Sequence, residues 1–288
     1  DGKFHKIEVR SVKPGLTVRS RKGYQSPRGK APAAAKEATG KASAELLDAL
    51  NSPIPVSGVS MRLFAAPFKG ATAAKGGPPN ASVLMGVELL GRNLALAPDG
   101  KIEISYVAVD EKGKAKAGST DTLTTSLKPD TKTRVQQTGF RMLNRFDLPP
   151  GRYHLRVASR DVAGSMTGSV GYDLDVPDYS KQPLSMSGIL MTSMSGSAMV
   201  TAKVDDQTKQ VLPAPPIAAR TFPQNDEIAL FTEIYDNQDG PAHRVDITTT
   251  IQTDEGRVLF KNEDKRNSSE LQGKKGGYGY SDRKEHTS

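Results

Sequence analysis

Four histidines are the side chains of this sequence best suited to acid–base or zinc chemistry, because imidazole titrates near neutral pH. They are His5, His154, His243 and His286. No two of them have the local spacing of a zinc site, and alternation in strand-like segments places His5 and His154 on surface faces. A Ser-His-Asp arrangement can assemble from distant positions and stays open, although the sequence has no Gly-x-Ser-x-Gly nucleophile elbow.

Two groups of acidic residues have spacings that suggest a cation site. Asp236–Gly240 (DNQDG) resembles part of a calcium loop, but it lacks the alternating oxygen ligands and distal Glu of an EF-hand, so we expect a hairpin turn. Asp173, Asp175 and Asp178 could share a cation at a domain junction, but alternation directs Asp173 and Asp175 outward as solvated charges. The chain has no cysteine, which excludes thiolate chemistry and disulfides. We therefore expect no catalytic residue, no metal-binding residue and no cofactor, in a protein that is not an enzyme.

A basic N-terminal arm accounts for the net charge of +8, since residues 1–41 hold eleven Lys/Arg and three acidic residues. Such an arm could contact an anionic surface. The candidate polyanion contacts are Lys13, Arg19, Arg21 and Lys22. Gly273–Tyr280 (GKKGGYGY) has a composition compatible with nucleic-acid stacking, but a loop is the simpler interpretation and nucleic-acid binding is not expected. Carbohydrate binding is less favoured, because the chain has no Trp and 6% aromatic residues.

The elements that position these residues are mostly strands, and Leu148–Tyr179 gives the strongest signal. A Pro-Pro-Gly corner leads into a strand with alternating Tyr153, Leu155 and Val157, followed by a polar turn and a second strand. This pattern predicts the last hairpin of an immunoglobulin-like antiparallel β-sandwich, with Tyr153 as a tyrosine corner that determines the fold. We expect its hydroxyl to bind nearby backbone rather than a ligand.

Residues 56–179 contain enough strand candidates for one complete sandwich. The candidates are Val59–Phe68, Ser82–Leu90, Lys101–Asp110, Thr120–Leu127, Arg134–Phe146, Tyr153–Ser159 and Ser169–Val176. Apolar alternation predicts the inner faces of the two sheets. One face comprises Val83, Met85, Val87 and Leu89, and the other comprises Ile102, Ile104, Tyr106 and Ala108.

The remaining chain divides into three parts. Residues 1–26 form a short hairpin, and residues 27–55 form a linker with a helix at Ser43–Leu50 and Ser43 as its N-cap. Residues 180–288 predict a second, partial immunoglobulin-like sandwich with a long internal loop at Ser193–Arg220. Its strand candidates are Leu184–Thr192, Glu227–Tyr235, Arg244–Thr253 and Arg257–Lys261. We expect no closing hairpin after Asn262, which leaves an open edge.

The first 24 residues, DGKFHKIEVRSVKPGLTVRSRKGY, resemble the closing strands of the A-type domain in bacterial von Willebrand factor A (VWFA)-related domain proteins. Gly151–Asp178, Leu184–Thr192 and Phe222–Asn237 are similar to the C-terminal half of that family. The resemblance implies a C-terminal fragment, with a truncated A-type domain before the immunoglobulin-like sandwiches. The metal-ion-dependent adhesion site of A-type domains is built on Asp-x-Ser-x-Ser, which is absent here, so no metal-binding residue carries over.

Together these patterns predict a non-catalytic structural or protein-interaction region. The resemblance implies an extracytoplasmic protein, secreted or in the cell envelope. Sandwiches of this kind would space and present neighbouring domains and offer strand edges to protein partners. The alternative is a polyanion- or envelope-surface-binding module that acts through residues 1–41. No apolar run approaches the roughly 18–20 residues of a transmembrane helix.

Overall fold

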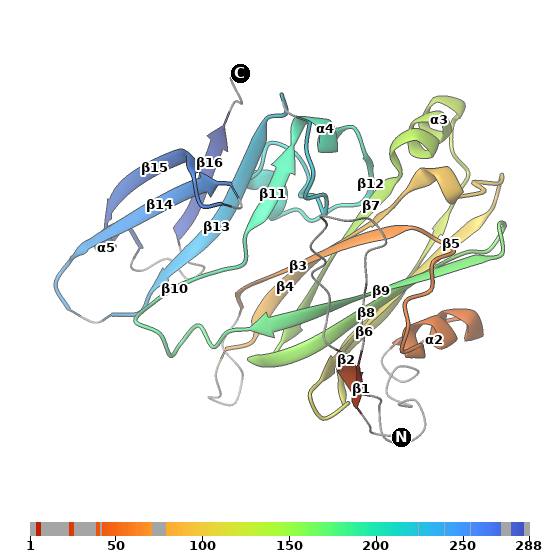
Figure 1. Cartoon of the computed structure of the whole chain (residues 1–288), viewed down its shortest axis with the longest axis horizontal. Coiled ribbons are helices and arrows are strands. Elements are labelled where there is room, and N and C mark those ends of the chain that lie inside the picture. Colours follow the sequence, from red (N-terminus) through yellow and green to blue (C-terminus); the bar gives the residue numbers. More distant parts are fainter. Residues whose placement is uncertain are drawn as a thin grey trace.

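The computed structural model describes residues 4–6, 23–25, 39–40, 42–70, 79–223, 225–238, 240–253, 255–271 and 278–284. Figure 1 shows a molecule built mainly from strands, with the two sheets of one sandwich at one end and further sheets at the other. The predicted all-β, sandwich-like fold class is confirmed. Near the N-terminus, β1 (Phe4–Lys6) and β2 (Gly23–Gln25) form an antiparallel pair.

The first sandwich consists of two four-stranded sheets, with strand orders β6-β5-β8-β9 and β12-β7-β4-β3. Its strands are β3 (Met61–Lys69), β4 (Ala81–Leu89), β5 (Lys101–Asp110), β6 (Ala115–Thr124), β7 (Phe140–Leu148), β8 (Gly151–Asp161), β9 (Met166–Val176) and β12 (Val200–Lys203). β12 runs parallel to β7, and the other neighbours are antiparallel. The predicted inner faces are confirmed, because every residue assigned to them lies buried in one core: Val83, Met85, Val87, Leu89, Ile102, Ile104, Tyr106 and Ala108.

α2 (Ala44–Asn51) packs against the outer face of the β6-β5-β8-β9 sheet and confirms the predicted helix. Its apolar side forms a small core with that sheet, comprising Leu46, Ala49, Leu50, Val107 and Ala158. Ser43 occupies the N-cap position, but its side chain does not cap the helix. Its hydroxyl instead donates a hydrogen bond to Glu103 of β5 at 2.7 Å, so this side chain ties the helix start to the sheet.

The predicted strand Arg134–Phe146 is wrong in its first part, where α3 (Pro129–Thr138) precedes β7. Pro129 lies in the first helical turn, where its fixed φ favours the helix. Gly139, with φ 85°, ends the helix in the left-handed region that glycine tolerates. Val135 is the buried residue of α3, and the helix rests on η1 (Gly91–Asn93). A helix with one apolar contact leaves little periodicity in the sequence, which explains the error.

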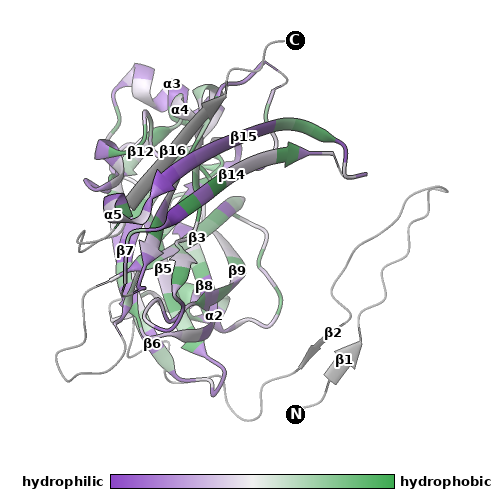
Figure 2. Cartoon of the chain, turned by 90° about the vertical axis from the view of Figure 1, so that its left-hand side faces the viewer, coloured by the Kyte–Doolittle hydropathy of each residue, from purple (hydrophilic) through white to green (hydrophobic). Residues whose placement is uncertain are grey.

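The second β unit consists of one four-stranded and one two-stranded sheet. β13 (Ile228–Asp236) pairs along one edge with β10 (Leu184–Met186) and β11 (Leu190–Ser193), and along the other with β16 (Tyr278–Lys284). β14 (Arg244–Gln252) and β15 (Val258–Asn267) form a two-stranded ribbon, followed by α5 (Ser268–Leu271). Figure 2 shows this ribbon standing out from the body, with hydrophobic residues near its far end. Ile251, Val258 and Leu259 are exposed there.

Two expectations for the second β unit are corrected. The predicted strand Leu184–Thr192 is interrupted, because the backbone N–H of Gly188 leaves the β13 ladder and donates to the carbonyl of Pro67 in β3 at 2.8 Å. β16 also pairs with the edge of β13, although no closing hairpin was expected after Asn262 and the edge was expected to stay open. β16 forms because its backbone pairs with the free edge of β13. The alternation of residues within 278–284 gives no information about that distant edge.

The predicted long loop Ser193–Arg220 contains α4 (Met194–Ser197), β12 and η2 (Thr208–Gln210). Val200 of β12 pairs with Phe140 of β7, so this segment enters a sheet of the first sandwich. Residues that the sequence places in the second unit therefore complete a sheet of the first. Among the described residues, no helix is long and apolar enough to cross a bilayer.

Candidate functional site

The outer face of the β12-β7-β4-β3 sheet points away from the core of the first sandwich. The second β unit covers this face and buries it. The residues that meet here form what we call the joint core: Phe64, Ala66, Phe68, Leu84 and Leu143 from the sheet, and Leu190, Leu212, Ala218 and Phe231 from the second unit. The rings of Phe68 and Phe231 stack with centroids 6.3 Å apart. The two units are thus joined by continuous apolar contact.

A buried ion pair reinforces this joint. The Arg141 guanidinium in β7 donates to Glu88 in β4 at 3.1 Å, and both side chains are at most 1% exposed. Arg141 also donates to the carbonyls of Pro215 (3.1 Å) and Gly196 (3.0 Å), and Glu88 accepts from the backbone N–H of Ala218 (3.0 Å). Burial lowers the pKa of Arg141, and the Glu88 charge offsets part of that effect. The pair therefore fixes the segment 196–218 against the sheet.

Two tyrosines form a second link between the units. Tyr179 and Tyr235 meet edge to face with centroids 5.0 Å apart, and burial raises the pKa of both hydroxyls. Tyr179 donates to the carbonyl of Pro67 at 2.8 Å, while Tyr235 accepts from the backbone N–H of Lys69 at 2.9 Å. Both hydroxyls thus hold the end of β3 against the second unit.

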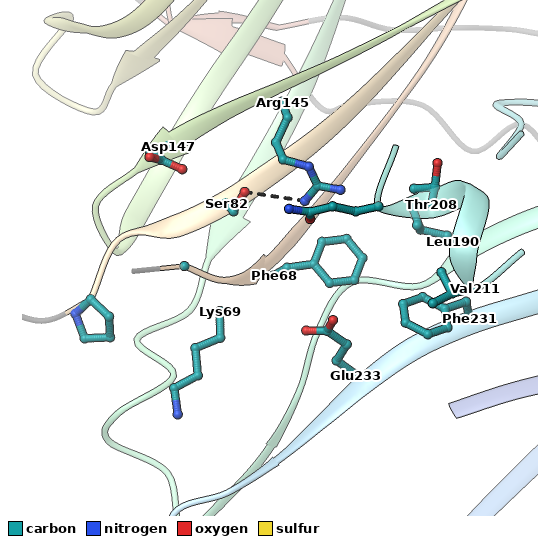
Figure 3. A pocket seen from close by; sticks show the side chains of 13 residues that line it. Phe68, Lys69, Ser82, Arg145, Asp147, Leu190, Thr208, Val211, Phe231 and Glu233 are labelled. Carbon is teal, nitrogen blue, oxygen red and sulfur yellow. Dashed lines mark hydrogen bonds between the residues drawn. The ribbon is translucent and has the colours of Figure 1, made fainter. Parts of the chain in front are cut away.

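Beside the joint core lies a cavity of about 780 Å³, which we call the inter-unit cavity. Figure 3 shows side chains from both units converging on it. Its apolar wall includes Phe68, Leu190, Val211 and Phe231. Its volume falls in the range of roughly 300–1,000 Å³ typical of small-molecule sites. We therefore take it as the candidate functional site.

The charged groups of the cavity are Lys69, Arg145, Asp147 and Glu233. Arg145 binds Asp205 through two nitrogens, at 2.8 and 2.9 Å, and lies 5.7 Å from the centre of the Phe68 ring. Lys69 donates to the Asn237 side chain at 3.1 Å. Burial raises the pKa of the Glu233 carboxyl, and this rise is partly offset by the Tyr235 hydroxyl at 2.5 Å and the Arg145 charge. Both cations of the cavity are thus already partnered.

Tyr153 lies where the sequence places a tyrosine corner. Its ring is buried at the start of β8, and its hydroxyl donates to the carbonyl of Pro149 at 2.7 Å, four residues upstream. This is the backbone contact that the pattern predicts. Burial raises the pKa of Tyr153. The residue lies in the core of the first sandwich and does not line the inter-unit cavity.

We expect Tyr153→Phe to lower the free energy of unfolding by about 1 kcal/mol, because the substitution removes one hydrogen bond and keeps the ring. Urea unfolding followed by circular dichroism measures the change. Tyr172→Phe is the matched control, since Tyr172 is a half-buried tyrosine of the neighbouring strand β9. Equal stability of Tyr153→Phe and the parent protein would contradict a fold-determining role for this hydroxyl.

The other acidic candidates do not converge on one point. Asp173 pairs with His154 at 2.8 Å, and Asp175 pairs with Arg152 at 3.2 Å; both pairs are exposed. Asp178 is bound by Ser180 and Lys181, whose contacts lower its pKa. Across the described parts of the chain, no group of three His, Asp or Glu side chains is placed to hold a metal ion.

The turn after β13 brings Asp236 and His243 together, with 3.7 Å between the carboxylate and imidazole. Asp239 of the DNQDG segment lies outside the described residues, as do His286 and the candidate polyanion contacts. Those contacts are Lys13, Arg19, Arg21 and Lys22. Their role stays a prediction.

Sequence reasoning did not single out Arg145 or Glu233. Both lie in strands, where one charged residue among apolar neighbours is the ordinary sign of a solvated face. Only the packing of one unit on the other turns these positions into a cavity wall.

Comparison of the chain with protein-family models, with curated proteins and with solved structures finds no match.

Proposed function

We propose that this chain is a non-catalytic structural and protein-interaction region of a secreted or envelope-exposed bacterial protein related to the VWFA-domain proteins. In this proposal both β units are immunoglobulin-like, and they space and present the domains beside them. The motifs of residues 1–24 and the Tyr153 corner support the assignment.

The observation that carries the proposal is the joint between the units. β12 enters the sheet of the first sandwich, the joint core fills the interface, and the Arg141–Glu88 pair is buried within it. Domains that touch through a small polar interface move relative to each other, whereas a large apolar interface holds them fixed. A fixed pair of β units is suited to hold a neighbouring domain at a set distance.

The non-catalytic part of the proposal is supported by where the described imidazoles lie. His154 pairs with Asp173 on an exposed face of β8 and β9. His243 lies in the turn region before β14, near Asp236. Both lie outside the inter-unit cavity.

Spin labels on the two units test the rigidity that this function requires. The chain has no cysteine, so Thr122→Cys in β6 and Thr248→Cys in β14 give a doubly labelled protein with no background labelling. Both threonines are exposed strand residues. We expect one narrow distance distribution by double electron–electron resonance. A broad or multimodal distribution in the parent protein would contradict the proposal.

A further inference from the structure

We propose that the inter-unit cavity binds an alkylammonium group, with Glu233 as its anionic contact and the Phe68 and Phe231 rings as the surface for its carbon chain. This inference goes beyond the scaffold role and does not depend on it. It assigns a binding site, and a chemical class of ligand, to the space between the two units.

Among the described residues, the two carboxylates of the cavity keep acceptor capacity that its two cations do not use. Arg145 is neutralised by the two-point contact with Asp205, and Lys69 is held by Asn237. Glu233 accepts from the Tyr235 hydroxyl through one carboxylate oxygen. Within the described residues, neither Glu233 nor Asp147 forms an ion pair with Lys or Arg at 4.0 Å or less. A ligand that donates hydrogen bonds and carries positive charge therefore matches the cavity best.

The charge balance leads to the same ligand class. Two cations, Lys69 and Arg145, face three carboxylates when the Asp205 partner of Arg145 is counted with Asp147 and Glu233. In the part of the chain that the structure describes, two positive and three negative charges leave one net negative charge. A half-buried carboxylate loses solvation, and a bound ammonium replaces part of that solvation with a charge-assisted hydrogen bond.

The apolar wall of the cavity indicates that the ligand carries a carbon chain beside its ammonium. Phe68, Leu190 and Phe231 are at most 6% exposed, and Val211 is 38% exposed. Figure 3 shows the Glu233 carboxylate pointing toward the Phe68 ring, with the Lys69 ammonium turned away from it. An ammonium at Glu233 thus places an attached carbon chain against the aromatic pair.

Two sources can supply this chemistry, namely a free alkylamine or the lysine side chain of a partner polypeptide. The shared feature is a primary ammonium on a flexible carbon chain. Both sources fit a half-open cavity lined by a carboxylate and aromatic rings.

Isothermal titration with n-hexylamine tests the inference, with hexanoate as the probe of opposite charge. We expect hexylamine to bind and hexanoate not to bind. Glu233→Gln should weaken hexylamine binding by about tenfold or more, because it removes the negative charge that strengthens the hydrogen bond to the ammonium. The Gln side chain still accepts from Tyr235, so the variant keeps the local structure.

Asp206→Asn is the matched control, because Asp206 is an exposed carboxylate near the cavity that does not line it. It should leave hexylamine binding unchanged. Val211→Trp narrows the cavity at a partly exposed position and should abolish binding without unfolding the protein. Failure of hexylamine to bind the folded parent protein, or equal affinity of Glu233→Gln and parent, would overturn the inference.

Short peptides distinguish the two sources. If acetyl-Gly-Lys-Gly-amide binds more tightly than hexylamine, and its Nε-acetylated form does not bind, the ligand is a lysine side chain of a partner. If hexylamine binds and the peptide does not, the ligand is a free amine. Both results support the binding of an ammonium group at Glu233. Binding of the acetylated peptide as tightly as the free lysine peptide would contradict this binding mode.

Discussion

Arg141→Ala is expected to lower the free energy of unfolding by about 3–5 kcal/mol, because it leaves the Glu88 carboxylate buried without its counter-charge. The substitution also removes the Arg141 donors to the carbonyls of Pro215 and Gly196, both of which lie at the joint. Loss of these contacts loosens residues 196 and 215 against the sheet, while β12 keeps its backbone pairing with β7. We expect a lower urea midpoint and, in the spin-labelled protein, a broader distance distribution between Thr122→Cys and Thr248→Cys.

The matched control is Arg152→Ala, which breaks a second cross-strand pair between an arginine and a carboxylate. Arg152 and Asp175 are 76% and 81% exposed, so solvent screens their interaction and the expected loss is below about 1 kcal/mol. A change for Arg141→Ala as small as that for Arg152→Ala would show that the buried pair does not hold the joint.

Leu84→Ala is expected to destabilise the protein by about 2–5 kcal/mol, as large-to-small substitutions do in a packed core. Leu84 lies on the face of β4 opposite Val83 and Met85, and it is buried only because the second β unit covers that face. Its side chain therefore reports directly on whether the joint exists. Urea unfolding of the parent and the variant measures the difference.

Leu259→Ala in β15 controls for the loss of a leucine, because Leu259 is 50% exposed on the ribbon and its truncation should change stability by less than about 0.5 kcal/mol. If Leu84→Ala behaved like Leu259→Ala, the outer face of the sheet would be exposed to water in solution. The joint core would then be contradicted, and the fixed spacing in the proposed function would lose its basis.

Period-two patterning by itself determined the two inner faces of the first sandwich. Ile102, Ile104 and Tyr106 alternate with polar residues along one strand, and the residues assigned to both inner faces lie in a single core. The Tyr153 corner was predictable for the same reason, since a Pro-Pro-Gly turn before an alternating strand is a local signal. Both patterns are local, because strand alternation and turn formation depend on residues that are close in the sequence.

The tertiary structure alone decided what lies on the outer face of the β12-β7-β4-β3 sheet. Alternation directs Leu84 and Phe68 away from the first core, but it cannot report that Phe231, far along the chain, covers them. The positions of β12 and β16 were hidden for the same reason, because each pairs with a strand edge distant in sequence. The inter-unit cavity, with Arg145 and Glu233 in its wall, arises where two surfaces from separate parts of the chain meet without filling the space between them. Contacts between surfaces depend on how whole units pack, and no local pattern encodes that packing.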